Sequence, residues 1–235
     1  MNLPPVLLLP GMMLDHRVYA GQLTSLSRTT EVLVGNITGF ETIAEIAVDV
    51  LRSAPPRFAL VGLSMGGIVA FEIWRQAAER VTHLALLDTT PYVEAPERQT
   101  LRLEQLAMVE TGKLRDVMVN SMKPLYLAKR NRTNGQLVQQ ILDMALAAGS
   151  DVFRRQSLAL RNRAGSTETL QTITCPALVL CGREDALCPV DFHATMASAI
   201  PGADLQVLAG CGHLSTMEEP AAVASALQRL LKRST

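Results

Sequence analysis

Short, uninterrupted apolar runs recur along the chain, and a turn-forming residue follows most of them. Runs without polar alternation are typical of strands that are buried on both faces of a parallel sheet. Stretches with helical periodicity separate the runs, and this alternation predicts an α/β fold of about six parallel strands with helices on both faces. The expected strands are residues 6–9, 31–34, 58–61, 84–87, 177–181 and 205–208.

One long stretch breaks the alternation. Residues 94–170 contain helical periodicity in several pieces and no clear strand. Helices inserted between two strands of one sheet predict a cap above the carboxyl ends of the strands. We therefore expect an α/β core formed by residues 1–93 and 171–235 and a helical cap formed by residues 94–170.

The apolar run 58–61 leads into Gly62-Leu-Ser64-Met-Gly66, which matches the G-x-S-x-G pattern of a strand–turn–helix nucleophile elbow. Glycines on both sides leave room for the strained turn, and the amphipathic run that follows places Ser64 at the positive end of a helix. Glycine-rich turns also produce this pattern by chance, so a role for Ser64 as a nucleophile depends on partners elsewhere in the chain.

A serine nucleophile needs a base, and the base needs a carboxylate that orients it. His213 lies in a glycine-containing loop just past the last predicted strand, which makes it the candidate base. Asp185 directly follows another buried strand and is the preferred acid, while Asp88 and Glu184 remain rivals. The order Ser64, Asp185, His213 is the order found in α/β-hydrolases.

With these residues in place, the chain resembles the α/β-hydrolase superfamily, and in it the small capped serine esterases and enol-lactonases. The matching stretches are Leu7-Leu-Leu-Pro-Gly-Met-Met, Val61-Gly-Leu-Ser-Met-Gly-Gly, Val179-Leu-Cys-Gly-Arg-Glu-Asp and Gly212-His-Leu followed by Glu219-Pro. The resemblance implies hydrolysis of a carboxylic ester or lactone through an acyl-enzyme on Ser64, with the backbone N–H groups of Met12 and Met65 as the oxyanion hole.

Two departures from the family pattern accompany the resemblance. The chain starts at the strand that leads to the oxyanion loop, without the usual preceding β-hairpin, so six strands are expected rather than eight. Pro10-Gly11 stands where the family often has His-Gly. Since the oxyanion donor is the backbone N–H of the next residue, the substitution leaves that donor in place.

Other functions stay open at this point. A ligand receptor or interaction protein could keep the same fold and triad with negligible turnover, and a C–C bond hydrolase or lyase is a third possibility on the same fold. The intact Ser64, Asp185 and His213 favour the enzyme. A zinc site formed by Cys181, Cys188, Cys211 and His213 is a weaker alternative; otherwise no metal or cofactor is expected.

The charge balance bears on partners and location. The 22 Lys and Arg residues equal the 22 Asp and Glu residues, so the sequence does not predict a nucleic-acid partner. No stretch approaches the ~18 apolar residues that cross a bilayer, and the N-terminus lacks the basic start of a secretory signal. We expect a cytoplasmic protein with four reduced cysteines, without a membrane partner.

The predicted cap carries an excess of positive charge, with twelve Lys or Arg residues against eight Asp or Glu residues. Arg154, Arg155, Arg161 and Arg163 gather near its end, and residues 154 and 161 fall on one helical face. We predict that Arg154 and Arg161 bind a carboxylated substrate or an acidic acyl-carrier partner. The alternative is an ordinary solvated helical face.

Overall fold

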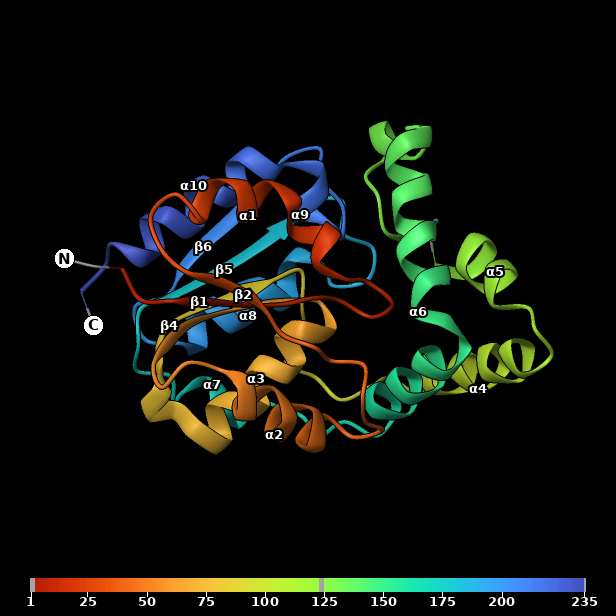
Figure 1. The fold of residues 1–235 in the computed structure, drawn as a ribbon, viewed down its shortest axis with the longest axis horizontal. Coiled ribbons are helices and arrows are strands. Elements are labelled where there is room, and N and C mark those ends of the chain that lie inside the picture. Colours follow the sequence, from red (N-terminus) through yellow and green to blue (C-terminus); the bar gives the residue numbers. More distant parts are fainter. Residues whose placement is uncertain (1–2, 123–124, 235) are drawn as a thin grey trace.

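The sheet is built from six parallel strands, as predicted (Figure 1). The computed structural model describes residues 3–122 and 125–234. The strands are β1 (Val6–Leu9), β2 (Val32–Val34), β3 (Phe58–Leu63), β4 (Val81–Leu87), β5 (Ala177–Gly182) and β6 (Asp204–Leu208). Strand β4 starts three residues before the expected position, because it includes two polar residues, Thr82 and His83, that are buried. The His83 ring lies 3.1 Å from the Thr82 hydroxyl and donates to the Arg233 carbonyl, which satisfies its polar atoms.

The strand order, β2-β1-β3-β4-β5-β6, shows where the chain changes direction across the sheet. After β1 the chain adds β2 on one side, and it then returns to place β3 on the other side. Leu9 at the end of β1 lies opposite Gly62 near the end of β3. In open α/β sheets, ligands bind beyond the carboxyl ends of the strands at such a switch point. The loops after β1 and β3 therefore start side by side where a site is expected.

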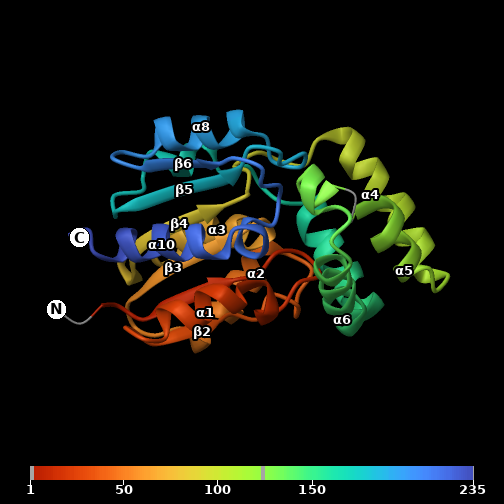
Figure 2. The ribbon, with the colours of Figure 1, turned by 90° about the horizontal axis from the view of Figure 1, so that it is seen from above.

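Helices cover both faces of the sheet (Figures 1 and 2). Helices α1 (Ala20–Leu26) and α10 (Pro220–Leu231) lie on one face, and α2 (Ile43–Ser53), α3 (Met65–Ala77) and α8 (Val190–Ala199) lie on the other. The start of α2 follows from its sequence, since the N-cap Thr42 hydroxyl accepts from the Glu45 N–H and donates to the Glu45 carboxylate. Four short elements connect these parts: η1 (His16–Tyr19), η2 (Ala78–Arg80), α7 (Thr167–Leu170) and α9 (Ser215–Glu218).

A group of helices lies beyond the carboxyl ends of the strands, at the right of Figure 1. These elements are α4 (Pro96–Glu110), α5 (Leu114–Val117), the π-helical turn η3 (Met118–Met122), η5 (Lys129–Asn131) and α6 (Gly135–Arg161). Helix α6 bends at Gly149, whose φ of 83° and ψ of 175° interrupt the helix and suit a residue without a Cβ. The described residues of 94–170 contain no strand, and we call this segment the cap.

The second half of α6 fastens this cap to the core. Phe153 is fully buried in a hydrophobic cluster that runs through both parts. The buried Gln156 side chain accepts from the Met13 N–H at 2.8 Å and donates to the Ile37 carbonyl at 3.2 Å. Because one apolar cluster spans core and cap, the division at residues 94 and 170 stays an interpretation.

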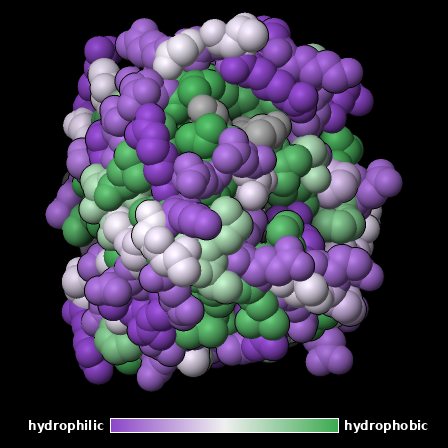
Figure 3. All heavy atoms as spheres, turned by 90° about the vertical axis from the view of Figure 1, so that its right-hand side faces the viewer, coloured by the Kyte–Doolittle hydropathy of each residue, from purple (hydrophilic) through white to green (hydrophobic). Residues whose placement is uncertain are grey.

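Exposed apolar side chains concentrate in the cap. Figure 3 views that face, where hydrophobic side chains emerge between polar ones. Among the described residues, eight large hydrophobic side chains are exposed, and five of them belong to the cap: Leu101, Leu103, Met108, Leu125 and Leu146. In the described ranges, no helix combines the length and the apolar character needed to cross a membrane.

Candidate active site

Ser64 occupies a strained turn between β3 and α3. Its φ of 53° and ψ of −115° are unusual for a residue with a side chain. Its N–H donates to the Leu87 carbonyl at 2.9 Å, and its own carbonyl accepts from the Thr89 hydroxyl at 2.7 Å. These bonds to the neighbouring strand end hold the turn, so the side chain of Ser64 is presented at the edge of the sheet.

The glycines of the elbow are required by close backbone contacts. A Cβ on Gly62 would lie 2.4 Å from the Gly66 carbonyl oxygen, and a Cβ on Gly66 would lie 2.1 Å from the Leu9 carbonyl oxygen. Real Cβ atoms do not approach that closely, so a larger residue at either position would move β1 or α3. The G-x-S-x-G pattern is thus explained by packing at this turn.

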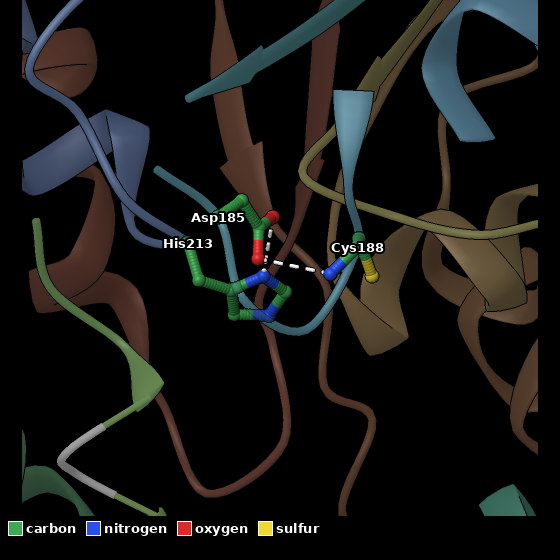
Figure 4. Close-up of side chains that lie close together, drawn as sticks. All are labelled: Asp185, Cys188 and His213. Atoms are coloured by element: carbon green, nitrogen blue, oxygen red, sulfur yellow. Dashed lines mark hydrogen bonds and ion pairs between the residues drawn. The ribbon is translucent and has the colours of Figure 1, made fainter. Parts of the chain in front are cut away.

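Three side chains from separate loops form one hydrogen-bonded chain. The Ser64 hydroxyl lies 2.8 Å from His213 Nε2, and His213 Nδ1 lies 2.8 Å from Asp185 Oδ2. Figure 4 shows the Asp185 carboxylate facing His213 and the backbone of Cys188. Its other oxygen accepts from the N–H groups of Leu187 and Cys188 at 2.8 and 2.9 Å. Asp185 can only accept, so Nδ1 carries the proton and Nε2 is left to accept from the serine.

The environment of His213 favours the protonated ring. Burial works against the imidazolium, but the charge of Asp185 and its hydrogen bond outweigh burial, and the pKa of His213 is raised above its ordinary value. His213 is almost fully buried. The arrangement therefore stabilises the imidazolium that forms when the ring takes a proton from Ser64.

The rival acids have other partners. Asp88 is fully buried after β4, where its two oxygens accept from the N–H groups of Gly182 at 3.1 Å and Ser215 at 3.0 Å. Burial and the charge of Asp185 raise the pKa of Asp88 to about 8. Glu184 accepts from the Lys129 N–H at 2.9 Å. Among the described residues, the carboxylate that hydrogen-bonds to His213 belongs to Asp185.

The two predicted oxyanion donors lie beside Ser64. Met65 is the first residue of α3, and Met12 belongs to the turn closed by the Leu14 N–H on the Gly11 carbonyl. Gly11 is so near the nucleophile that a Cβ on it would lie 3.4 Å from the Ser64 Cβ. Within the described part of the chain, neither methionine N–H donates a hydrogen bond. Both residues line the cavity above Ser64.

Glu218 links the histidine loop to the cap, and the sequence analysis did not single it out. Its carboxylate accepts from the Gly212 N–H at 2.7 Å and from the Ala128 N–H at 2.9 Å. Next to it, the His213 N–H donates to the Tyr126 carbonyl at 2.8 Å, and the Tyr126 ring stacks on the imidazole. The run Glu218-Glu219-Pro220 looks like an ordinary helix start, so nothing in the sequence alone pointed to this bridge.

A cavity of about 420 Å³ lies between the core and the cap, with Ser64 and His213 in its wall. Clefts of this size accommodate small-molecule ligands. Most of the lining is apolar and includes Leu14, Ile68, Met122, Leu125, Leu160 and Phe192. Three methionines also line the cavity, namely Met12, Met65 and Met122.

The predicted substrate arginines lie outside this cavity. Arg154 pairs with Glu41 at 2.6 Å, and Arg161 donates to the Asn162 side chain at 3.3 Å. The cavity is lined instead by Arg98, Arg102 and Arg163. Helix α6 ends at Arg161, and the chain turns before Arg163. That turn directs Arg163 toward the cavity.

The described residues contain one group of side chains with the spacing of metal ligands, namely Asp185, Cys188 and His213. Cys181 and Cys211, from the predicted zinc set, do not belong to it. Burial and the nearby Asp185 raise the pKa of the Cys188 thiol well above its usual range, which disfavours the thiolate that zinc requires. Asp185 and His213 are already engaged with each other and with Ser64. The donor set therefore fits the serine triad better than a metal site.

A six-stranded α/β sheet with a serine elbow and a histidine–carboxylate pair at its carboxyl edge defines a hydrolase-type fold. Comparison with known families agrees, since the model of the alpha/beta hydrolase family matches residues 6–226. The chain belongs to the alpha/beta hydrolase family, and the predicted family and fold are confirmed.

Several relatives have described activities. An esterase from Thermogutta terrifontis, solved with malate bound, is 30% identical and superposes with a TM-score of 0.89, covering 97% of this chain and 89% of that one. A pimeloyl-[acyl-carrier protein] methyl ester esterase from Nitrosomonas europaea is 24% identical, covering 93% of this chain and 92% of its own length. The enol-lactonase from Burkholderia xenovorans LB400 shares the fold, with 22% identity, a TM-score of 0.85, and coverage of 99% and 93%.

Proposed function

We propose that this protein hydrolyses a carboxylic ester or lactone of small to medium size through an acyl-enzyme on Ser64. The observation that carries the proposal is the hydrogen-bonded chain from Ser64 through His213 to Asp185, placed in the wall of a largely apolar cavity. The esterases among the relatives support the same class of reaction.

In the first half of the reaction, His213 Nε2 takes the proton of the Ser64 hydroxyl as its oxygen attacks the ester carbonyl carbon. The negative charge that develops on the carbonyl oxygen is stabilised by the free N–H groups of Met12 and Met65. Loss of one such donor typically costs about 2.7–4 kcal/mol of transition-state stabilisation. His213 then returns the proton to the alcohol, which leaves.

In the second half, a water molecule takes the place of the alcohol. His213 removes a proton from the water, the hydroxyl attacks the acyl carbon, and the proton passes to the Ser64 oxygen as the acid is released. Asp185 keeps the imidazole in the tautomer that can accept at Nε2, and its charge stabilises the imidazolium in both halves.

The cavity sets the class of substrate. A volume of about 420 Å³ with apolar walls suits the acyl chain of a small molecule. The pimeloyl-[acyl-carrier protein] methyl ester esterase extends the candidates to an ester carried by an acyl-carrier protein, and the malate bound to the Thermogutta esterase extends them to carboxylated compounds. Within this proposal the partner is a small-molecule ester or lactone, and a cytoplasmic location stays a prediction.

The proposal is tested with p-nitrophenyl esters of graded acyl length and with a fluorophosphonate probe. We expect multiple turnovers, a preference for one range of acyl lengths, and labelling of Ser64 that disappears in Ser64→Ala. Labelling of another serine in folded protein would refute the nucleophile. Release of a single p-nitrophenol per chain without further turnover would favour the receptor alternative.

A further inference from the structure

Four charged side chains stand together in the wall of the cavity, and we call them the arginine cluster: Glu94, Arg98, Arg102 and Arg163. Glu94 is buried and forms ion pairs with Arg102 and with Arg163, the latter at 2.9 Å. Arg98 approaches the same carboxylate only to 3.4 Å, and its side chain is 43% exposed. Glu94 precedes α4, two arginines lie on α4, and Arg163 follows α6.

The cluster has more positive than negative charge. Burial opposes the charge of Glu94, but Arg102 and Arg163 outweigh it and lower the pKa of this carboxyl below its ordinary value. Guanidinium groups stay protonated in proteins. Among the residues that line the cavity, Glu94 is the acidic one, so three cations face one anion. This cavity wall therefore attracts a negatively charged group.

The arginines also keep unused hydrogen-bond donors. Arg163 donates to the Tyr92 and Leu160 carbonyls through Nε and Nη1, and Arg102 donates through Nη1 to the Met12 sulfur, a weak acceptor. Within the described residues, Nη2 of Arg102, Nη2 of Arg163 and the guanidinium of Arg98 donate no hydrogen bond. Polar donors in a largely apolar wall are stabilised when an acceptor reaches them.

A purely structural role explains part of this arrangement. Glu94 and Arg163 stand at the two ends of the cap, so their ion pair helps to close it onto the core. Arg102 adds a second buried partner for Glu94. Both of these arginines contact Oε2 of Glu94, whereas Oε1 has the looser 3.4 Å contact with Arg98 Nε, which is too long and misaligned to count as a hydrogen bond. Arg98 lines the cavity, and its contact with Glu94 through Nε leaves both of its terminal N–H₂ groups without a hydrogen bond among the described residues. Pairing with Glu94 does not explain those unused donors.

We propose that the arginine cluster binds a carboxylate of the substrate, so that the enzyme prefers esters that carry a carboxylate group away from the scissile bond. Planar guanidinium groups bind carboxylates through paired hydrogen bonds. The contact of Arg102 with the Met12 side chain places the cluster next to the oxyanion loop, in the same cavity as Ser64. This inference rests on the proposed ester hydrolysis.

The test compares pairs of esters that differ in one carboxylate. The first series pairs mono-p-nitrophenyl esters of dicarboxylic acids of four, six and eight carbons with p-nitrophenyl esters of the matching monocarboxylic acids. The second series pairs acyl esters of 4-hydroxybenzoate with acyl esters of phenol, which moves the carboxylate to the alcohol side. For each pair we measure the ratio of kcat/KM for the carboxylated ester to kcat/KM for the neutral ester.

We expect this ratio to be well above one in at least one series for the wild-type protein, and to fall about tenfold in Arg98→Gln, mainly through KM. A tenfold change corresponds to about 1.4 kcal/mol of lost binding. Arg98→Lys keeps the charge but loses the paired geometry, so it should restore part of the ratio. Arg98 is 43% exposed and its contact with Glu94 is long at 3.4 Å, while Arg102 and Arg163 stay paired with that carboxylate, so these variants should fold.

Arg154→Gln is the matched control, because it removes one cap arginine that is equally exposed and lies outside the cavity. It should leave the ratio unchanged. The inference is overturned if the ratio is near one in both series, or if Arg98→Gln and Arg154→Gln change it equally. Both results would leave hydrolysis by Ser64 intact, whereas absence of hydrolysis of every ester would refute the proposed function itself.

Discussion

Two polar groups of side chains face the same cavity, and they are built in different ways. The triad comes from loops that follow β3, β5 and β6, so the register of the sheet brings its members together. The arginine cluster comes from the two ends of the cap, where helix ends decide which side chain reaches the cavity. In a parallel sheet, residues that follow different strands meet at the same edge, so their proximity can be predicted even when they are far apart in the sequence. A helical insertion gives no such rule, because its helix ends and bends decide where each side chain lies.

The two groups also differ in how completely their hydrogen bonds are satisfied. Each oxygen of Asp185 has a partner, and His213 uses both ring nitrogens. The cluster around Glu94 has surplus charge and unused donors. Preorganised groups that need no rearrangement are what acyl transfer requires, while unsatisfied donors are what a recognition site offers to a ligand. The variants below test this contrast, in order of expected effect.

The largest effect is expected at Ser64. Ser64→Ala removes the nucleophile and should lower kcat by at least about 10⁴-fold, since removal of a triad member leaves only the catalysis due to binding and the oxyanion hole. The melting temperature should change little because the side chain is small and borders the cavity. Steady-state hydrolysis of a neutral p-nitrophenyl ester and thermal unfolding measure the two quantities. Residual activity within tenfold of wild type would contradict the acyl-enzyme.

The two buried aspartates should respond differently. Asp185→Asn should lower kcat by about 10⁴-fold, because an amide no longer fixes the Nδ1–H tautomer or stabilises the imidazolium. Asp88→Asn should lower kcat by on the order of tenfold or less. The main effect of Asp88→Asn should be on stability. The new amide N–H₂ would face the N–H of Gly182 or Ser215, so one buried donor would lose its acceptor, at a cost of about 1–3 kcal/mol.

Kinetics and urea unfolding of both variants separate these outcomes. We expect Asp185→Asn to keep its stability and lose turnover, and Asp88→Asn to keep turnover and lose stability. That pair of results would distinguish a catalytic carboxylate from a structural one. A larger loss of kcat in Asp88→Asn would reassign the orienting acid to the end of β4.

The fold could be predicted from the sequence, and so could the gathering of Ser64, Asp185 and His213 at the carboxyl edge of the sheet. Each of these residues follows a buried strand closely or lies in a glycine-containing loop after another strand. The sequence did not predict which arginines face the cavity. Arg154 and Arg161 do share one helix, since both lie in α6 after its bend at Gly149, but helical periodicity does not show which surface that face meets, and neither side chain lines the cavity. Glu218 and Gln156 were not predicted either, since the bond of Glu218 to Ala128 and the bond of Gln156 to Met13 join residues 90 and 143 positions apart, which no local pattern reveals.

A moderate effect is expected where the cap meets the core. Gln156→Leu leaves the buried Met13 N–H and Ile37 carbonyl without a partner, which should cost about 1–3 kcal/mol for each group. Met13 has a φ of 59° and follows Met12, the proposed oxyanion donor, so the loop should lose order and kcat should fall, though less than in Asp185→Asn. The free energy of unfolding in urea and kcat for a neutral ester are the measurements.

Ser157→Ala is the control for that experiment. Ser157 is the next residue of α6 and is fully buried, and its hydroxyl has no hydrogen-bond partner among the described residues. Its loss should change stability and kcat little. Equal effects of the two substitutions would mean that packing of α6, and not the hydrogen bond to Met13, supports the oxyanion loop.

The smallest effect concerns the charge of Arg98 at His213. The base must be neutral to accept the serine proton, so the acid limb of the pH profile of kcat/KM follows the pKa of His213. Burial lowers this pKa, but Asp185 raises it more strongly, and the pKa lies above its ordinary value. Arg98 is among the charges that lower this pKa. Arg98→Gln removes that contribution, so the pKa should rise and the acid limb for a neutral ester should move to higher pH.

Arg98→Lys keeps the charge and should keep the limb in place, and Arg154→Gln should not move it. Arg98 is partly exposed, so salt should screen its charge, and the Debye length is about 8 Å at physiological ionic strength. Added salt should therefore reduce the difference in the position of the acid limb between wild type and Arg98→Gln. Two results would show that Arg98 does not act on the triad through its charge. The acid limb could move to lower pH in Arg98→Gln, or it could move by the same amount in Arg98→Gln and Arg154→Gln. The arginine cluster and the triad would then be separate parts of one cavity, joined only by the substrate that bridges them.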